Sequence, residues 1–107
     1  MKLLLIIVNN DDAKAVAKSL VKNKFYSTKL ASTGNFLLSG NTTILVGCQD
    51  EDVDKVIGII KSEAHQRKKM VTPIASMSAG LLSPSPIEVT IGGATIFIIN
   101  VEQFVKL

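Results

Sequence analysis

Lys2-Leu3-Leu4-Leu5-Ile6-Ile7-Val8 is the stretch that decides the fold, because its last six residues are apolar without interruption. A strand with one face in water alternates apolar and polar residues, whereas an unbroken Leu/Ile/Val run is typical of a strand covered on both faces. Asn9 and Asn10 follow at once, so the run is too short for the apolar core of a signal peptide or for a membrane span. We therefore expect a β-strand buried on both faces, in a cytoplasmic protein.

The residues beyond this strand predict two amphipathic helices. Asn10 is placed to cap the first helix, over 11–23, where two aspartates complement the positive helix end and apolar residues recur every three or four positions. Asp50 is placed to cap the second helix, over 51–64. The inward stripe of this second helix consists of Val53, Val56, Ile57, Ile60 and Ala64.

Further strands are predicted on both sides of the second helix. The alternating segment 25–33 and the β-branched segment 41–47 precede it, and 87–91 and 94–101 lie near the end of the chain. Gly92-Gly93 separates the last two segments and is a two-residue hairpin signal. These segments supply enough strands for one sheet.

The region between the second helix and the last strands has no clear period. We interpret the basic run 65–69 as the end of the helix, because the negative end of a helix dipole favours cations. The segment 71–87 contains three prolines and four serines, which predicts a long flexible loop.

The order β-α-β-β-α-β with a final strand is that of an α+β, ferredoxin-like sandwich with an extra C-terminal strand. A chain of 107 residues with 47% hydrophobic and 20% charged residues forms a single domain, spanning 1–107. Both helices of this fold cover one face of the sheet, yet 3–8, 44–46 and 96–99 carry apolar residues toward both faces. Each outward apolar side chain left in water forgoes about 1.5–3 kcal/mol. We therefore expect further copies of the chain to cover the second face.

The composition argues against several classes of function. Cys48 is the single cysteine and His65 the single histidine, so the chain has neither an internal disulfide nor a Cys/His metal framework. The net charge of +3 is not gathered into the basic stripe of a nucleic-acid-binding domain, and aromatic residues make up only 5% of the chain. We expect no enzymatic activity, no cofactor, no metal and no nucleic-acid partner.

One polar stretch carries residues suited to ligand binding. Phe36 lies among turn residues between Thr28 and Asn41, where an aromatic ring can stack on a flat ligand. The Asn41 amide offers a donor and an acceptor side by side, which suits the edge of a base. Phe36 would also fit a contact within its own loop, so the chemistry by itself leaves both interpretations open.

Four runs of the sequence carry a family resemblance: Thr28-Lys29-Leu30-Ala31-Ser32-Thr33-Gly34, Phe36-Leu37, Gly40-Asn41-Thr42-Thr43 and Gly92-Gly93-Ala94-Thr95. Together they resemble the PII-like cyclic di-AMP receptor proteins, and the resemblance extends over essentially the whole chain. It implies a homotrimer of ferredoxin-like subunits whose sheets face inward. It also implies that cyclic di-AMP, a bacterial second messenger, or a related adenine nucleotide binds in clefts between subunits and signals to an unknown downstream protein partner.

The resemblance implies a role for each matching residue. Phe36 corresponds to the residue that stacks on an adenine, and Leu37 to one that lines the pocket. Thr28 and Asn41 correspond to polar contacts with the nucleotide. Gly47 corresponds to a point where the backbone approaches the ligand closely.

Other positions match less directly or depart from the family pattern. Phe97 resembles a further aromatic wall of the pocket. Tyr26 stands where the family carries an arginine, a natural bidentate partner for phosphate. Asn35 stands where the family has a second glycine, and Lys106 where it has a glutamine. The loop 71–87 lacks the family's tyrosines.

Two alternatives stay open at this point. A divergent PII-like protein-interaction module that has lost nucleotide binding is indicated by Tyr26, Lys106 and the Leu81-Leu82 pair in the long loop. A small hydrolase of the acylphosphatase type would need an arginine near an early loop, whereas Arg67, the only arginine, comes far along the chain.

Overall fold

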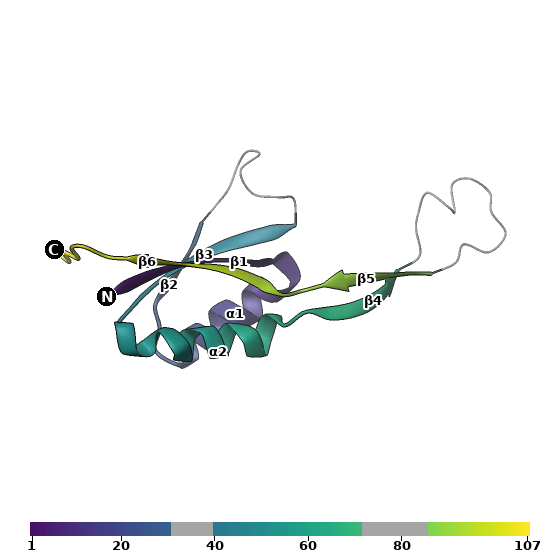
Figure 1. Ribbon diagram of the computed structural model, residues 1–107, viewed down its shortest axis with the longest axis horizontal. Coiled ribbons are helices and arrows are strands. Elements are labelled where there is room, and N and C mark those ends of the chain that lie inside the picture. The colour runs from purple at the N-terminus through teal and green to yellow at the C-terminus, as the bar shows by residue number, and fades with distance from the viewer. Residues whose placement is uncertain (31–39, 72–85) are drawn as a thin grey trace.

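The computed structural model describes residues 1–30, 40–71 and 86–107. Within these ranges the chain forms one four-stranded sheet, two α-helices on it, and a separate two-stranded ribbon (Figure 1). Asn35, Phe36 and Leu37 lie outside the described residues, as does most of the predicted loop. The elements in chain order are β1 (Lys2–Asn9), α1 (Asn10–Lys22), β2 (Ser27–Leu30), β3 (Asn41–Cys48), the short 3-10 helix η1 (Asp50–Asp52), α2 (Val53–Ala64), β4 (Arg67–Val71), β5 (Ile87–Ile91) and β6 (Ala94–Asn100).

The main sheet has the strand order β2-β3-β1-β6, and all its neighbouring strands are antiparallel. The apolar run forms a strand, β1, as predicted, and this strand pairs with β3 on one side and with β6 on the other. The order is the ferredoxin-like one, with β6 as the fourth strand. The α+β class predicted from the sequence is therefore confirmed.

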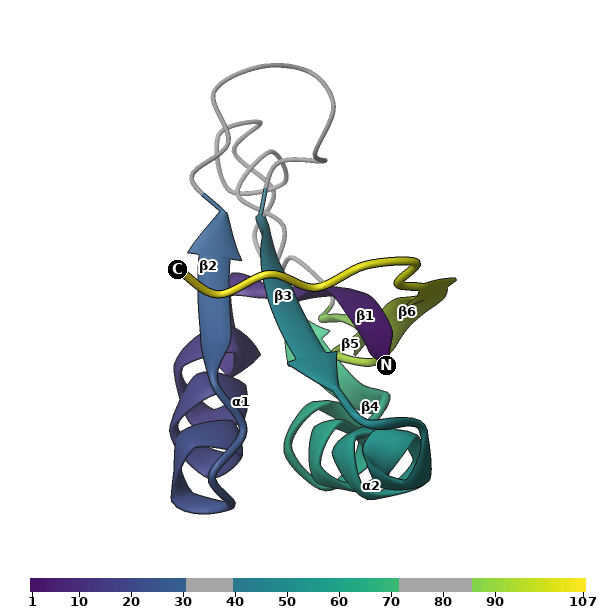
Figure 2. The same cartoon turned by 90° about the vertical axis from the view of Figure 1, so that its left-hand side faces the viewer.

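Both helices lie side by side against one face of this sheet, as Figure 2 shows. Alternate residues of β1 point to them, and Leu4, Ile6 and Val8 are almost wholly buried. The core is completed by Ala13, Val16 and Leu20 of α1, Val56, Ile60 and Ala64 of α2, and Ile44, Val46 and Cys48 of β3. The apolar stripes predicted for the two helices thus form most of the core with one side of the sheet. Val21, which the sequence placed in the stripe of α1, is instead 64% exposed.

The helix caps differ in detail from the predicted ones. Helix α1 begins one residue earlier, and Asn9, not Asn10, caps it by accepting a hydrogen bond of 2.8 Å from the Asp11 N–H. Asn10 instead accepts a hydrogen bond from the Thr42 hydroxyl and donates its backbone N–H to the Gly40 carbonyl at 2.8 Å. Asp50 makes no cap for α2. Its carboxylate lies 2.9 Å from the amino group of Met1, whose hydrogen bond lowers the pKa of Asp50.

The second sheet was not predicted. The basic run forms β4 rather than a helix end, and β4 pairs with β5 from Arg67 opposite Ile91 to Val71 opposite Ile87. The hairpin predicted at Gly92-Gly93 is therefore wrong, because β5 pairs with β4 while β6 pairs with β1. The added strands are this ribbon, inserted between α2 and β6, and not an extra strand at the C-terminus.

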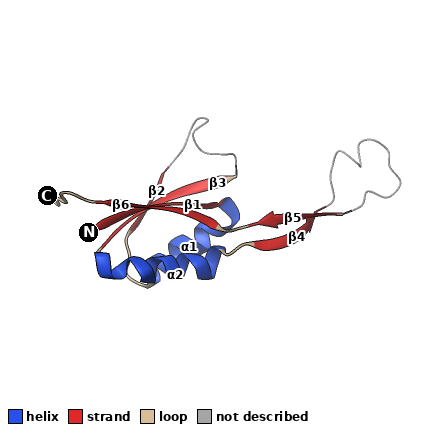
Figure 3. Cartoon of the chain, in the orientation of Figure 1, coloured by secondary structure: helices blue, strands red, loops and turns tan. Residues whose placement is uncertain are grey.

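The ribbon makes the molecule long. The chain measures 62 × 28 × 20 Å, and its radius of gyration of 17.6 Å exceeds the roughly 13 Å expected for a compact domain of this length. Figure 3 shows β4 and β5 projecting beyond the helices and the main sheet. Among the described helices, none is long and apolar enough to cross a membrane.

Candidate functional site

The face of the main sheet that points away from the helices is apolar and largely uncovered within the chain. The register places the residues of this open face in rows across the strands. One row runs through Thr28, Leu45, Leu5 and Phe97, and the next through Gly47, Leu3 and Ile99. Phe97 is 53% exposed and Ile99 45%, so the prediction of a two-faced apolar sheet is confirmed.

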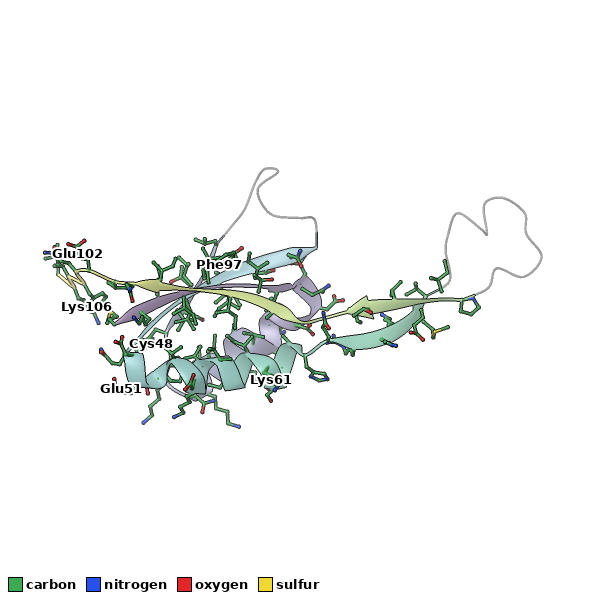
Figure 4. All side chains as sticks on the ribbon, in the orientation of Figure 1. Cys48, Glu51, Lys61, Phe97, Glu102 and Lys106 are labelled. Atoms are coloured by element: carbon green, nitrogen blue, oxygen red, sulfur yellow. The ribbon has the colours of Figure 1, made fainter. Side chains whose placement is uncertain are left out.

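The open face brings together several of the predicted ligand-binding residues. Thr28, Gly47 and Phe97 come from β2, β3 and β6 and share this face by register. Asn41 begins β3 on the same side of that strand. In Figure 4 Phe97 lies on the side away from the helices, whereas Cys48 lies on the helix side.

Tyr26 lies just before β2 and is 90% exposed. Its hydroxyl is therefore free to meet a ligand or a neighbouring chain near the row that contains Gly47. Asn35, Phe36 and Leu37 belong to the segment between β2 and β3, outside the described residues. Their part in the site stays a prediction.

Gly47 leaves an opening on this face. A Cβ built on Gly47 would meet no atom of the described residues within 4 Å, so their packing gives no reason for a glycine there. A close approach by another molecule is one reason for a missing side chain on an exposed strand. Thr43, on the same face of β3, has a buried hydroxyl without a hydrogen-bond partner among the described residues.

A pocket of about 470 Å³ lies where the ribbon joins the sheet. Asn41 is one of its walls, and the other lining residues were not among the predicted site residues. The lining residues are Ile7, Asn9, Asn41, Gln66, Thr90, Ile91, Gly92, Gly93, Ala94 and Thr95. Apart from Asn41, the sequence signal for this pocket was the run Gly92-Gly93-Ala94-Thr95, which carries the family resemblance, but its two glycines were interpreted as a hairpin turn.

An ion pair beside this pocket joins the ribbon to α1. The Arg67 guanidinium donates to both carboxylate oxygens of Asp12, at 2.8 and 3.3 Å, and also to the His65 carbonyl at 3.3 Å. Asp12 is only 6% exposed, and its hydrogen bond raises the pKa of Arg67. In the sequence the helix dipole alone accounts for this aspartate, so its pairing with Arg67 was not predicted.

The described residues contain no group of three or more His, Cys, Asp or Glu side chains that could hold a metal ion. Cys48 is buried on the helix side, and burial, followed by the charges of Asp52 and Asp50, raises the pKa of its thiol.

The chain is similar to known proteins over its full length. A family model described as cyclic-di-AMP receptor matches residues 1–107. Among solved structures, a functionally unknown protein from Pediococcus pentosaceus ATCC 25745 is 37% identical, with a TM-score of 0.76, and the match covers 99% of this chain and 96% of that one. The family match and the ferredoxin-like strand order lead to one conclusion: the chain belongs to the cyclic-di-AMP receptor family, which is PII-like.

Proposed function

We propose that this protein is a non-enzymatic bacterial signalling protein of the cytoplasm that binds cyclic di-AMP, or a related adenine nucleotide, in clefts between the subunits of a homotrimer. The observation that carries the proposal is the open face. Its uncovered apolar rows and the candidate residues Thr28, Gly47 and Phe97 occupy the same side of one sheet.

The homotrimer follows from what the open face needs. Phe97 and Ile99 each expose about half of their surface, and the helices that could cover them already lie on the opposite face. Burying apolar area stabilises by about 25 cal/mol per Å². If copies of the chain are arranged with closed symmetry and their sheets face inward, apolar side chains from every strand become buried, and each contributes this stabilisation.

The nucleotide would then lie at the edge of the subunit interface. Thr28 and Asn41 would donate and accept hydrogen bonds, Gly47 would let the backbone approach, and Phe97 would form an apolar wall. Phe36, with Leu37 and Asn35 beside it, would stack on an adenine ring. A carboxamide and hydroxyls match the donors and acceptors of a base edge, which supports an adenine ligand.

Isothermal titration with cyclic di-AMP tests the ligand. Binding is expected, and Asn41→Ala is expected to weaken it by about tenfold, the equivalent of one hydrogen bond of about 1.5 kcal/mol. Asn23→Ala, which alters an asparagine at the far end of α1, is the matched control. If no binding is detected at high micromolar protein, cyclic di-AMP is excluded as the ligand, whereas the assigned fold is unaffected.

Tyr26→Arg tests the missing phosphate partner. Restoring a charge-assisted hydrogen bond should tighten binding by roughly ten- to a hundredfold. Tyr26→Gln is its neutral control. If Tyr26→Arg binds no more tightly than Tyr26→Gln, the phosphate does not lie near this position.

The second candidate is a PII-like protein-interaction module that has lost nucleotide binding. It is favoured by the uncharged Tyr26 and by the ribbon, where Met70 and Ile87 are more than half exposed. Capture of one dominant protein from the native host, unaffected by added cyclic di-AMP, together with no heat in the titration, would support this alternative over the first.

A further inference from the structure

The pocket at the base of the ribbon has walls from two parts of the molecule. Asn9, Asn41 and Thr95 belong to strands of the main sheet, whereas Gln66 and Gly92-Gly93 belong to the connections between that sheet and the ribbon. The width of the pocket therefore depends on how the ribbon is oriented relative to the sheet. Among the described strands, β4 and β5 pair only with each other, so backbone pairing does not set that orientation.

One side-chain contact does tie the ribbon base to the core. Arg67, the first residue of β4, reaches 55 positions back along the sequence to Asp12 in the first turn of α1. Both carboxylate oxygens accept a hydrogen bond, and a bidentate arginine–carboxylate pair has a defined geometry that a single contact lacks. Neither residue lines the pocket.

The two glycines make room for this contact. Gly92 and Gly93 have φ of +80° and +81°, a conformation that other residues rarely adopt. A Cβ on Gly92 would lie 2.6 Å from both the Arg67 Nη1 and the His65 carbonyl oxygen, and one on Gly93 would lie 2.9 Å from the Gln66 Cγ. The backbone that forms one wall of the pocket thus packs directly on the arginine.

The same turn of α1 holds the start of β3. Asn10 donates its backbone N–H to the Gly40 carbonyl and accepts from the Thr42 hydroxyl, on either side of Asn41. The first turn of α1 is therefore bonded both to the strand that carries Asn41 and to the ribbon that faces it.

We infer that Asp12 and Arg67 are positioning residues that hold the ribbon against the main sheet, shape the pocket between Asn41 and Gly92-Gly93, and couple a nucleotide bound at Asn41 to the orientation of the ribbon. This inference rests on the proposed function for the identity of the ligand. The position of the ribbon, by contrast, can be measured without any ligand.

The test measures the distance between spin labels on the ribbon and on α2. Labels are attached at Met70→Cys and Ser62→Cys in a Cys48→Ala background, and labelled subunits are refolded with an excess of unlabelled ones so that distances within one subunit dominate. Arg67→Gln should broaden or shift the distance distribution, and Arg67→Lys should restore part of it. Lys68→Gln is the matched control, because Lys68 pairs with Glu88 inside the ribbon at 3.2 Å and does not reach the core.

Cyclic di-AMP titrations on the same variants test the coupling. Arg67→Gln should weaken binding by about five- to 150-fold, the usual range of coupling between sites, and Lys68→Gln should leave it unchanged. Because a lone Asp12 carboxylate would be buried without its partner, the double variant Asp12→Asn/Arg67→Gln is measured if Arg67→Gln does not fold.

An unchanged distance distribution in the Arg67 variants would overturn the inference. So would a changed distribution with unchanged nucleotide affinity, because the ion pair would then fix the ribbon without shaping the site. If the wild-type protein binds no cyclic di-AMP, the proposed function fails, and the distance measurement alone decides whether the ion pair holds the ribbon.

Discussion

Replacing Phe97 by alanine should dissociate the proposed trimer. Phe97 projects from β6 on the open face and is 53% exposed in the single chain. An aromatic side chain carries about 150–250 Å² of surface, so the exposed half amounts to about 100 Å². At about 25 cal/mol per Å², covering it stabilises each subunit by about 2.5 kcal/mol.

The effect on assembly follows from the symmetry. Three copies together contribute about 7.5 kcal/mol per trimer, which is about five orders of magnitude in the association constant. Because the constant for a monomer–trimer equilibrium has units of concentration squared, the concentration of half-dissociation rises several-hundredfold, on the order of the square root of that factor.

Sedimentation across a dilution series measures this shift directly. Val21→Ala is the control, because Val21 is 64% exposed on α1 and lies on the helix side of the sheet. A Phe97→Ala protein that dissociates at the same concentration as the wild type would refute the idea that the open face is the subunit interface. A wild-type protein that is monomeric at every concentration would refute the trimer itself.

Two further predictions concern the helix side of the sheet. Leu20→Ala should lower the free energy of unfolding by about 2–5 kcal/mol, because Leu20 is fully buried in the core. Val21→Ala, at an exposed position of the same helix, should change it by less than about 0.5 kcal/mol. Urea denaturation of both variants measures the difference, and equal effects would contradict the assigned core. Cys48 should be alkylated much more slowly in the folded protein than in urea, because its side chain is buried and burial also raises the pKa of the thiol; rapid alkylation of the native protein would refute this. The raised pKa of Cys48 further predicts that the folded protein loses stability as the pH rises above about 8.5, the ordinary thiol pKa.

The sequence predicted the main sheet well because its signals are local. The unbroken apolar run of β1 identified a strand buried on both faces, and the stripes of α1 and α2 identified most of the residues that meet it. The same reasoning identified an uncovered second face. The bounds of the two helices differ from the predicted ones only at their ends, where Asn9 rather than Asn10 caps α1 and Asp50 makes no cap for α2.

The ribbon could not be predicted in this way. Arg67, Lys68 and Lys69 have low strand propensity, and a helix end explains a basic run just as well. They form a strand because β5 returns from across the intervening segment to pair with them, and Gly92-Gly93 then redirects the chain toward β1 instead of closing a hairpin.

The candidate site was likewise predicted from the sequence only in part. Thr28, Asn41, Gly47 and Phe97 were identified from the residues and a family resemblance, and the strand register places them on one side of the sheet. The pocket beside Asn41 and the Asp12–Arg67 pair were missed, because their parts come from distant segments.

The amino-acid sequence by itself determined which side chains must leave water, since the periodicity of each strand and helix records its burial. Only the tertiary structure decided which strand pairs with β5, how the ribbon is oriented relative to the sheet and which carboxylate forms the ion pair with Arg67. Such choices depend on the free energy of closing long segments of chain and on the space available once the core has packed, and neither quantity is written in a local pattern.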